Sequence, residues 1–221
     1  MQNRKKSLKT KHPQKQTEVI PYHKKPEKLS LEQWQIALRK QFVIGKNFVI
    51  KKLDGHPVFA DYTVYNPETK NTYKVALRDN SQQMNFCSCL DFKTNHLGTC
   101  KHIEAVLLKV NEKPSLALFL KRGYTPPYSS VYLQYGKERK VRLRIGTTSS
   151  AKIKKIAASF FDDNNYLNDF GFRHFEKFRS QAAEIDPDFR CYDDAFEYIL
   201  SRRNNNYRIE TLDLRYPREQ E

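Results

Sequence analysis

The feature that most constrains this chain is a short segment that pairs cysteines with a histidine. Cys87 and Cys89 form a Cys-x-Cys pair, and Cys100 and His102 form a Cys-x-His pair after the spacer 90–99. Zn²⁺ prefers a tetrahedron of thiolate and imidazole donors, and two such pairs joined by one loop supply it. We therefore expect these four side chains to bind a structural zinc ion. Four protein ligands close the coordination shell, so we expect no catalytic zinc.

Other interpretations of this segment remain open. Three of the four cysteines of the chain fall inside it, but a free cysteine is often only a small apolar core residue. A redox dithiol is a second alternative, although Cys-x-Cys lacks the Cys-x-x-Cys spacing of thioredoxin-like centres. His96, inside the spacer, could replace His102 as the nitrogen ligand.

The second ligand pair stands at the start of a predicted helix. Four apolar residues follow it at positions i, i+3, i+4 and i+7: Ile103, Val106, Leu107 and Val110. This spacing predicts an amphipathic helix with Cys100 and His102 around its first turn. Gly98 and Thr99, directly before it, suit a turn and an N-cap.

The same residues carry a resemblance to a known family. The strings Cys-Ser-Cys-Leu-Asp-Phe from residue 87 and Leu-Gly-Thr-Cys-Lys-His-Ile-Glu from residue 97 resemble the SWIM zinc finger, over about residues 73–110. They are similar to the region upstream of the motor in bacterial Swi/Snf-like helicases. The resemblance implies Zn²⁺ as cofactor, the same four ligands, and a helicase or ATPase as a partner. A weaker likeness continues through 131–144 and 186–195.

The charge of the chain points to a polyanionic partner. Lysine and arginine outnumber aspartate and glutamate by 40 to 25, a formal net charge of +15. Such an excess favours nucleic acid, and we expect DNA rather than RNA. No apolar run approaches the ~20 residues of a membrane span, and the basic N-terminus lacks the apolar region of a secretory signal. We therefore expect no membrane partner and a cytoplasmic location, associated with the nucleoid if the protein is bacterial.

Candidate nucleic-acid contacts come from three basic segments. They are Arg4, Lys5 and Lys6 near the N-terminus, Lys93 and Lys101 in the finger, and Lys140, Arg142 and Arg144 further along. Basic strands with aromatic neighbours can hold a nucleic-acid backbone and stack a base. The alternatives are a solubilising tail, solvated lysines and the ordinary polar face of a half-buried hairpin.

The pattern of the chain predicts an α+β fold with a small antiparallel sheet. Its segments are a disordered basic arm at 1–28, an α+β unit with the zinc finger at 29–113, a short helix and proline-rich linker at 114–130, and a hairpin plus helical unit at 131–221. Ser30 and Gln33 form a capping box for a first helix. Strands are expected at 47–53, 58–65 and 72–78, with Asp54–Gly55 as a hairpin turn.

The rest of the chain is predicted to form a β-hairpin followed by helices. Apolar residues alternate through 131–145, which predicts a hairpin with one polar outer face. Helical spacing follows in 150–161, 168–185 and 192–207. Asp193 and Asp194 suit the first turn of the last helix, where negative charge complements the helix dipole.

The chain contains no recognisable ATPase motif. A P-loop needs Gly-x-x-x-x-Gly-Lys-Ser/Thr, and the two Gly-Lys pairs, at Gly45 and Gly136, have neither the leading glycine nor the following hydroxyl residue. No paired carboxylates or nucleophile–base pair suggest a hydrolase, so we expect no enzymatic activity.

Two functions remain in competition. The leading hypothesis is a zinc-stabilised module that binds nucleic acid, either as a free-standing relative or as an accessory of a Swi/Snf-like helicase. The alternative is a protein–protein adaptor that docks a helicase or another partner.

Overall fold

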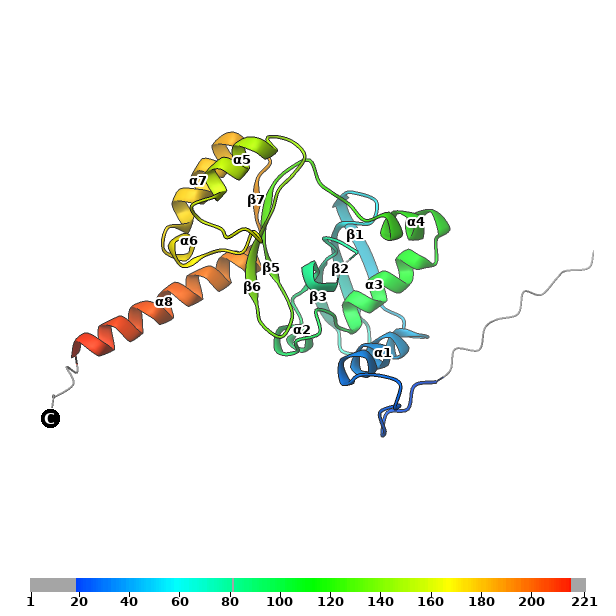
Figure 1. The fold of residues 1–221 in the computed structure, drawn as a ribbon. Coiled ribbons are helices and arrows are strands. Elements are labelled where there is room, and N and C mark those ends of the chain that lie inside the picture. The colour runs from blue at the N-terminus through cyan, green and yellow to red at the C-terminus, as the bar shows by residue number, and fades with distance from the viewer. Residues whose placement is uncertain (1–18, 81, 216–221) are drawn as a thin grey trace, which may run out of the picture.

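The computed structural model describes residues 19–80 and 82–215. It has the expected α+β fold, with two small sheets and their helices forming two lobes (Figure 1). We call residues 19–122 the finger lobe and residues 130–215 the C-terminal lobe. Arg4, Lys5 and Lys6, with most of the expected basic arm, lie outside the described residues. No helix in the described part is both long enough and apolar enough to cross a membrane.

The first helix begins where the sequence predicts. α1 (Leu31–Val43) has Ser30 as its N-cap, and the Ser30 side chain accepts from the Gln33 N–H at 3.1 Å. The Gln33 side chain in turn accepts from the Ser30 N–H at 2.9 Å, which completes the capping box. Trp34 Nε1 donates to the Pro21 carbonyl at 2.9 Å, so the segment before the helix folds back along it.

An antiparallel sheet of four strands forms the centre of the finger lobe. The strands are, in spatial order, β1 (Val49–Gly55), β2 (Ala60–Asn66), β3 (Asn71–Ala76) and β4 (Phe86–Cys87). The last strand is short and pairs only with the end of β3, where Val75 faces Cys87. This pairing fixes the first zinc-ligand residue against the sheet.

The prediction of a tight turn at Asp54–Gly55 was wrong. Gly55 belongs to β1 and pairs with Ala60, with a φ of +113° that glycine tolerates. The turn lies at 56–59, where His56 Nδ1 accepts from the N–H groups of Val58 and Phe59 at 3.2 and 3.1 Å. The His56 side chain shapes this turn by accepting from the backbone two and three residues later. Strand periodicity in the sequence does not reveal such a contact.

Short helices complete the finger lobe. They are η1 (Gln82–Met84), α2 (Leu90–Thr94), α3 (Lys101–Asn111) and α4 (Pro114–Arg122). α3 packs between α1 and the sheet (Figure 1). It buries Ile103, Val106 and Val110, the stripe that the sequence predicts. No residue of α4 is fully buried.

The C-terminal lobe is built on a second sheet. β5 (Ser130–Gln134) and β6 (Lys140–Arg144) form the expected hairpin, and β7 (Arg190–Cys191) pairs with β5 in parallel. The helices are α5 (Ser150–Ala157), α6 (Asp169–Arg173), α7 (Phe175–Ile185) and α8 (Asp193–Arg215). β7 makes β5 the central strand of this sheet. Tyr132 on β5 is only 4% exposed, so the prediction that it lies on a polar outer face was wrong.

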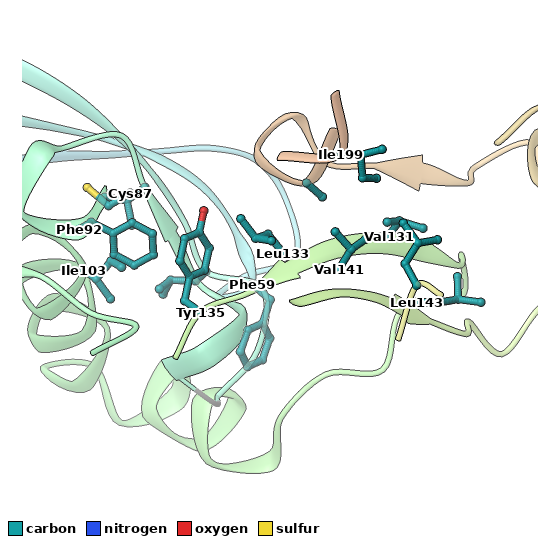
Figure 2. Close-up of a cluster of buried hydrophobic side chains, with 14 of the residues drawn as sticks. Phe59, Cys87, Phe92, Ile103, Val131, Leu133, Tyr135, Val141, Leu143 and Ile199 are labelled. Atoms are coloured by element: carbon teal, nitrogen blue, oxygen red, sulfur yellow. The ribbon is translucent and has the colours of Figure 1, made fainter. Parts of the chain in front are cut away.

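One hydrophobic core runs through both lobes. Phe92, Cys87 and Ile103 of the finger lobe lie next to Tyr135 and the apolar face of the hairpin (Figure 2). The rings of Phe92 and Tyr135 have centroids 4.5 Å apart. Ile199 of α8 covers the other end of the same cluster (Figure 2). The hairpin therefore packs directly against the finger lobe.

Candidate metal centre

The structure brings the four expected ligands to one point. Cys87 comes from β4, Cys89 is the N-cap of α2, Cys100 is the N-cap of α3, and His102 lies in the first turn of α3. Their sulfur and nitrogen atoms all lie within 4.8 Å of one another, and all four residues are buried. His96, the alternative nitrogen ligand, is exposed and lies outside this group, so His102 is the histidine placed to bind the metal.

Local backbone structure aims the sulfurs. The Cys89 Sγ accepts from the Phe92 N–H at 3.4 Å. The sulfur of the second ligand therefore also caps the N-terminus of the short helix α2. Cys100 has an extended backbone, and the helix starts one residue later, which brings its side chain and that of His102 toward the same space. Gly98 has a φ of +69°, which suits glycine in the reversal that leads into α3.

An aromatic wall sets the orientation of the imidazole. The His102 ring stacks on Tyr73 with centroids 4.2 Å apart and planes 25° apart, and Phe48 meets it edge-on at 5.7 Å. His102 Nδ1 lies 3.7 Å from Cys87 Sγ. The other nitrogen, Nε2, is buried and has no hydrogen-bond partner among the described residues. Nδ1 is therefore the atom placed to bind an ion.

The three thiols lie too close together for all of them to ionise without a cation. Hydrogen bonding to Cys100 and Cys89, with burial, raises the pKa of Cys87 strongly. Burial raises the pKa of Cys100 to about 12. Hydrogen bonds from these two thiols lower the pKa of Cys89, which holds the one favoured thiolate. A bound divalent cation supplies the positive charge that three neighbouring thiolates require.

The donor set fits Zn²⁺. Three soft thiolates and one imidazole in a closed, buried group are typical of structural zinc, and they leave no open position for a water or substrate. Zinc bound by Cys87, Cys89, Cys100 and His102 would tie β4, α2 and α3 together. Its chemistry there is structural: it joins segments that otherwise share few contacts.

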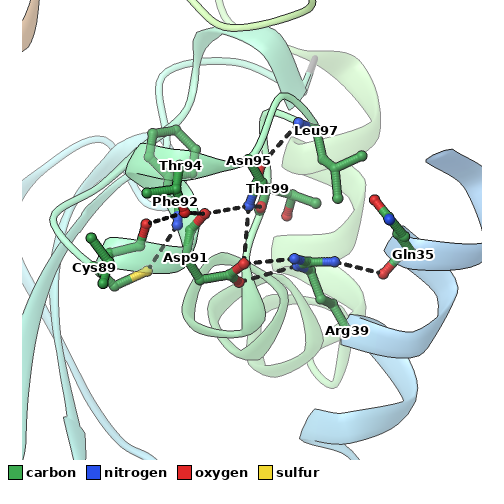
Figure 3. A network of polar contacts seen from close by, with 10 residues as sticks. Gln35, Arg39, Cys89, Asp91, Phe92, Thr94, Asn95, Leu97 and Thr99 are labelled. Carbon is green, nitrogen blue, oxygen red and sulfur yellow. Dashed lines mark hydrogen bonds and ion pairs between the residues drawn. The ribbon is translucent and has the colours of Figure 1, made fainter. Parts of the chain in front are cut away.

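A polar network holds the loop between the two ligand pairs (Figure 3). Arg39 of α1 donates to both carboxylate oxygens of Asp91, at 2.6 and 3.1 Å. Asn95 Nδ2 donates to the carbonyls of Asp91 and Thr99 at 2.6 and 3.1 Å, and its Oδ1 accepts from the Leu97 N–H at 2.8 Å. This network, which the sequence analysis missed, anchors the spacer to α1.

A second missed contact lies beside the ligands. Thr99 Oγ1 donates to Glu104 Oε1 at 2.7 Å, and both side chains are buried. Burial raises the pKa of Glu104. The string Thr-Cys-Lys-His-Ile-Glu contains both residues, but their spacing of five is not a helix-capping signature, so only the structure reveals the pair.

The comparisons with known proteins agree with this geometry. Residues 73–111 match the family model of the SWIM zinc finger. The match begins at Tyr73, which stacks on His102, and ends at Asn111, the last residue of α3. No curated protein and no solved structure matches the chain. The segment thus fits a SWIM-type zinc finger, a non-catalytic module that binds Zn²⁺.

The basic candidates of the finger face different surroundings. Lys93 is exposed on α2. Lys101 is half-buried, and its Nζ lies 5.3 Å from the centre of the Phe42 ring, which Lys46 approaches at the same distance. The Lys101 side chain thus packs partly against an aromatic ring of α1, whereas the Lys93 side chain is exposed to solvent.

The candidates of the hairpin also differ from one another. Lys140 is exposed and Arg142 half-buried, with Arg142 Nε donating to the Asn164 carbonyl at 3.2 Å. Arg144 is held on three sides, by Ser130 Oγ at 3.3 Å, the Arg78 carbonyl at 3.0 Å and the Tyr192 hydroxyl at 3.3 Å. Arg144 therefore contributes to the junction between the lobes as well as to the charge of β6.

Proposed function

We propose that this chain is a zinc-stabilised module that binds nucleic acid, with DNA as the preferred partner. The observation that carries the proposal is a group of basic side chains at the tip of the hairpin, beside the finger. We call it the hairpin ridge, and it consists of Lys93, Arg139, Lys140, Arg142 and Tyr166. A formal net charge of +15 for the chain supports the same partner class.

The hairpin ridge joins residues that are far apart in the sequence. Arg139, between β5 and β6, donates from Nη2 to the main-chain carbonyl of Lys93 on α2. This contact places the exposed finger lysine beside the basic strand β6, where the tip of the hairpin meets α2 (Figure 1). The finger segment that carries Lys93 thus contacts the hairpin segment that carries Lys140 and Arg142.

An aromatic ring lies inside the hairpin ridge. Lys140 Nζ and the Arg142 guanidinium carbon lie 5.3 and 5.2 Å from the centre of the Tyr166 ring. Lys140 is also 3.4 Å from Glu138, but both side chains are exposed, and such ion pairs contribute little. Cations flanking a half-buried tyrosine can contact phosphates while the ring stacks on a base.

The more specific part of the proposal is that the module works with a helicase. It is supported by the resemblance of the finger to the region upstream of a Swi/Snf-like motor. In this proposal the module acts beside such a motor. Its test is whether the purified chain stimulates or binds such a motor after nuclease treatment.

Salt titration tests nucleic-acid binding. Fluorescence anisotropy of single- and double-stranded oligonucleotides would be measured on zinc-verified protein across a salt series. The affinity is expected to fall steeply, with log K declining by roughly 0.9 per phosphate contact on a duplex. The triple variant Lys93→Gln, Lys140→Gln and Arg142→Gln should reduce that slope by about 2.7 if each side chain contacts one phosphate.

A matched control separates contact from net charge. Lys152, Lys154 and Lys155 are exposed on α5, and their triple replacement by glutamine removes the same charge. The control is expected to keep most of the slope. Equal slopes in the two triple variants would show that the hairpin ridge is not the contact surface.

The adaptor function has one observation in its favour. α4 exposes Leu118 and Phe119, at 49% and 39%, and neighbouring apolar side chains of this kind can form part of a partner surface. Recovery of one stoichiometric protein after nuclease treatment, with weak and salt-insensitive oligonucleotide binding, would favour the adaptor.

A further inference from the structure

A second candidate site lies at the junction of the two lobes, apart from the zinc ligands. It is a cavity of about 170 Å³ between the turn 56–59, the end of β3, the segment 124–128 and strands β6 and β7. None of the four zinc ligands lines it. It is close in size to an engineered cavity of ~150 Å³ that takes one benzene ring, so it can enclose a phosphate group, and the rest of a nucleotide would lie at its mouth.

The cavity is built in advance, because its linker wall is fixed. Gly146, directly after β6, packs so closely on the main chain of Pro127 and Tyr128 that a Cβ there would lie 2.3 Å from the Pro127 carbonyl oxygen. The Gly146 N–H donates to Ser129 Oγ at 3.0 Å, and the Thr148 N–H donates to the Pro127 carbonyl at 2.9 Å. The wall therefore does not need to order when a ligand binds.

The lining carries a net positive charge. Arg78, Arg144 and Arg190 contribute guanidinium groups, and Asp61 is the one acidic residue among the lining residues. Arg78 is already paired with Asp194, so Arg144 and Arg190 supply the charge available to a ligand. In the described part of the chain Arg144 and Arg190 form no ion pair with a carboxylate. Arg78 has its Nε buried without a hydrogen-bond partner in that same part. A buried, unpartnered N–H at a cavity wall is a donor that lacks its acceptor.

Tyrosine rings hold the guanidinium groups in place. The guanidinium carbon of Arg190 lies 4.0 Å from the centre of the Tyr128 ring, and that of Arg78 lies 3.9 Å from the centre of the Tyr192 ring. Burial, followed by the neighbouring Tyr192, raises the pKa of Tyr128 to about 12. Its hydroxyl therefore stays protonated at neutral pH and can donate. Stacked arginines and protonated hydroxyls form a wall rich in donors.

The remaining wall is flat and aromatic. The His56 ring lies 4.3 Å from that of Tyr124, and Phe59 stacks parallel to Tyr124 at 5.8 Å with planes 7° apart. His56 Nδ1 already accepts two backbone N–H groups, and burial, with the charge of Lys52, lowers its pKa. An uncharged ring system beside a cationic recess suits a ligand with a planar ring next to an anionic group.

We propose that this junction cavity binds the phosphate monoester of a nucleotide. Guanidinium groups recognise phosphate oxygens through paired N–H donors, and the aromatic wall gives the attached nucleoside a stacking surface. Two sources share this chemistry, a free mononucleotide and a phosphorylated strand end. The strand-end source rests on the nucleic-acid binding proposed above, whereas the free nucleotide does not.

The test uses the full zinc-loaded chain. Isothermal titration would be carried out with inorganic phosphate, with AMP and with adenosine, and anisotropy with one single-stranded oligonucleotide with and without a 5′-phosphate. AMP should bind more tightly than adenosine. Arg190→Gln should weaken AMP at least about tenfold, since hydrogen bonds to charged groups are the strong ones. Arg173→Gln, an exposed arginine on α6, is the matched control and should leave AMP binding unchanged.

A second variant guards against misfolding. Tyr128→Phe keeps the ring that stacks on Arg190 and removes only the hydroxyl, so a severalfold loss of AMP affinity with unchanged melting temperature supports the site. If AMP and adenosine bind equally weakly and a 5′-phosphate does not improve oligonucleotide binding, or if Arg173→Gln matches Arg190→Gln, the cavity is not a phosphate site.

The oligonucleotide arm separates this inference from the proposed function. If a 5′-phosphate improves binding in the wild type but not in Arg190→Gln, the strand end is the ligand. If AMP binds through Arg190 while no oligonucleotide binds, the site takes free nucleotides and the proposed function fails alone. If oligonucleotides bind with a steep salt slope, while AMP does not bind and a 5′-phosphate gains nothing, the inference fails alone.

Discussion

The guanidinium of Arg78 and the carboxylate of Asp194 form a buried, two-pronged ion pair across the junction of the lobes. Nη2 lies 2.7 Å from Oδ1 and Nη1 lies 3.1 Å from Oδ2, and each side chain is only 6% exposed. The Tyr135 hydroxyl also donates to Asp194 Oδ2 at 2.9 Å. Arg78 follows β3 of the finger lobe, whereas Asp194 begins α8, so the pair fastens one lobe to the other.

Asp194→Asn is expected to destabilise the protein by about 3 kcal/mol or more, because removing one partner leaves the other charge buried and unpaired. Urea unfolding of the zinc-loaded protein measures this. The double variant Arg78→Met, Asp194→Leu removes both charges and should be less destabilised than Asp194→Asn. A single variant that unfolds at the wild-type urea concentration would contradict the assigned role of the pair.

Cys100→Ser and His102→Ala are each expected to lose zinc and unfold the finger lobe. Structural zinc contributes on the order of 10 kcal/mol in small metal modules, so losing it outweighs any single packing contact. Elemental analysis gives the metal content, and thermal unfolding gives the stability. His96→Ala, an exposed histidine in the same loop, should retain both. Full zinc content in Cys100→Ser and His102→Ala would refute the ligand assignment.

Arg39→Gln should loosen the spacer loop without removing the metal. Arg39 and Asp91 are 22% and 36% exposed, so water screens their ion pair and the loss should stay near or below about 1 kcal/mol. The expected signature is faster hydrogen exchange of 90–99 at unchanged zinc content. Exchange that stays at the wild-type rate would mean that Asn95 alone holds the loop.

Cys191 should react with iodoacetamide far more slowly than a free thiol. Burial raises its pKa to about 12, with Arg179 acting in the opposite direction, and the thiolate is the reactive form. Below the pKa the rate should therefore rise about tenfold per pH unit from pH 7 to 10, whereas a thiol with a pKa of ~8.5 levels off. Mass spectrometry of the Cys191 peptide, from native and urea-unfolded protein, measures both rates.

The local features of the fold could be read from the sequence. The zinc ligands, the capping box at Ser30 and the apolar stripe of α3 all depend on residues within a few positions of one another. Spacing records such relationships directly, because one helical turn or one knuckle sets them. The hairpin strands β5 and β6 were predicted for the same reason.

The features that join the lobes could not be read in this way. β7 has two residues, Arg190 and Cys191, too few to show a period, and its parallel pairing with β5 leaves no local signal in the sequence. Tyr132 is buried on a face that was expected to be polar. Asp194 carries the signature of a helix first turn, and nothing nearby indicates its pairing with Arg78. The Arg39–Asp91 contact likewise depends on how α1 packs, which periodicity does not specify.

The separation of Arg78 and Asp194 has a consequence for biosynthesis. The two residues lie 116 positions apart, and all four zinc ligands are translated between them and well before Asp194. Since chains emerge from the ribosome N-terminus first, metal capture can be complete while Arg78 still has no counter-charge. Closure of the two lobes is then a late event that waits for the start of α8 to leave the exit tunnel.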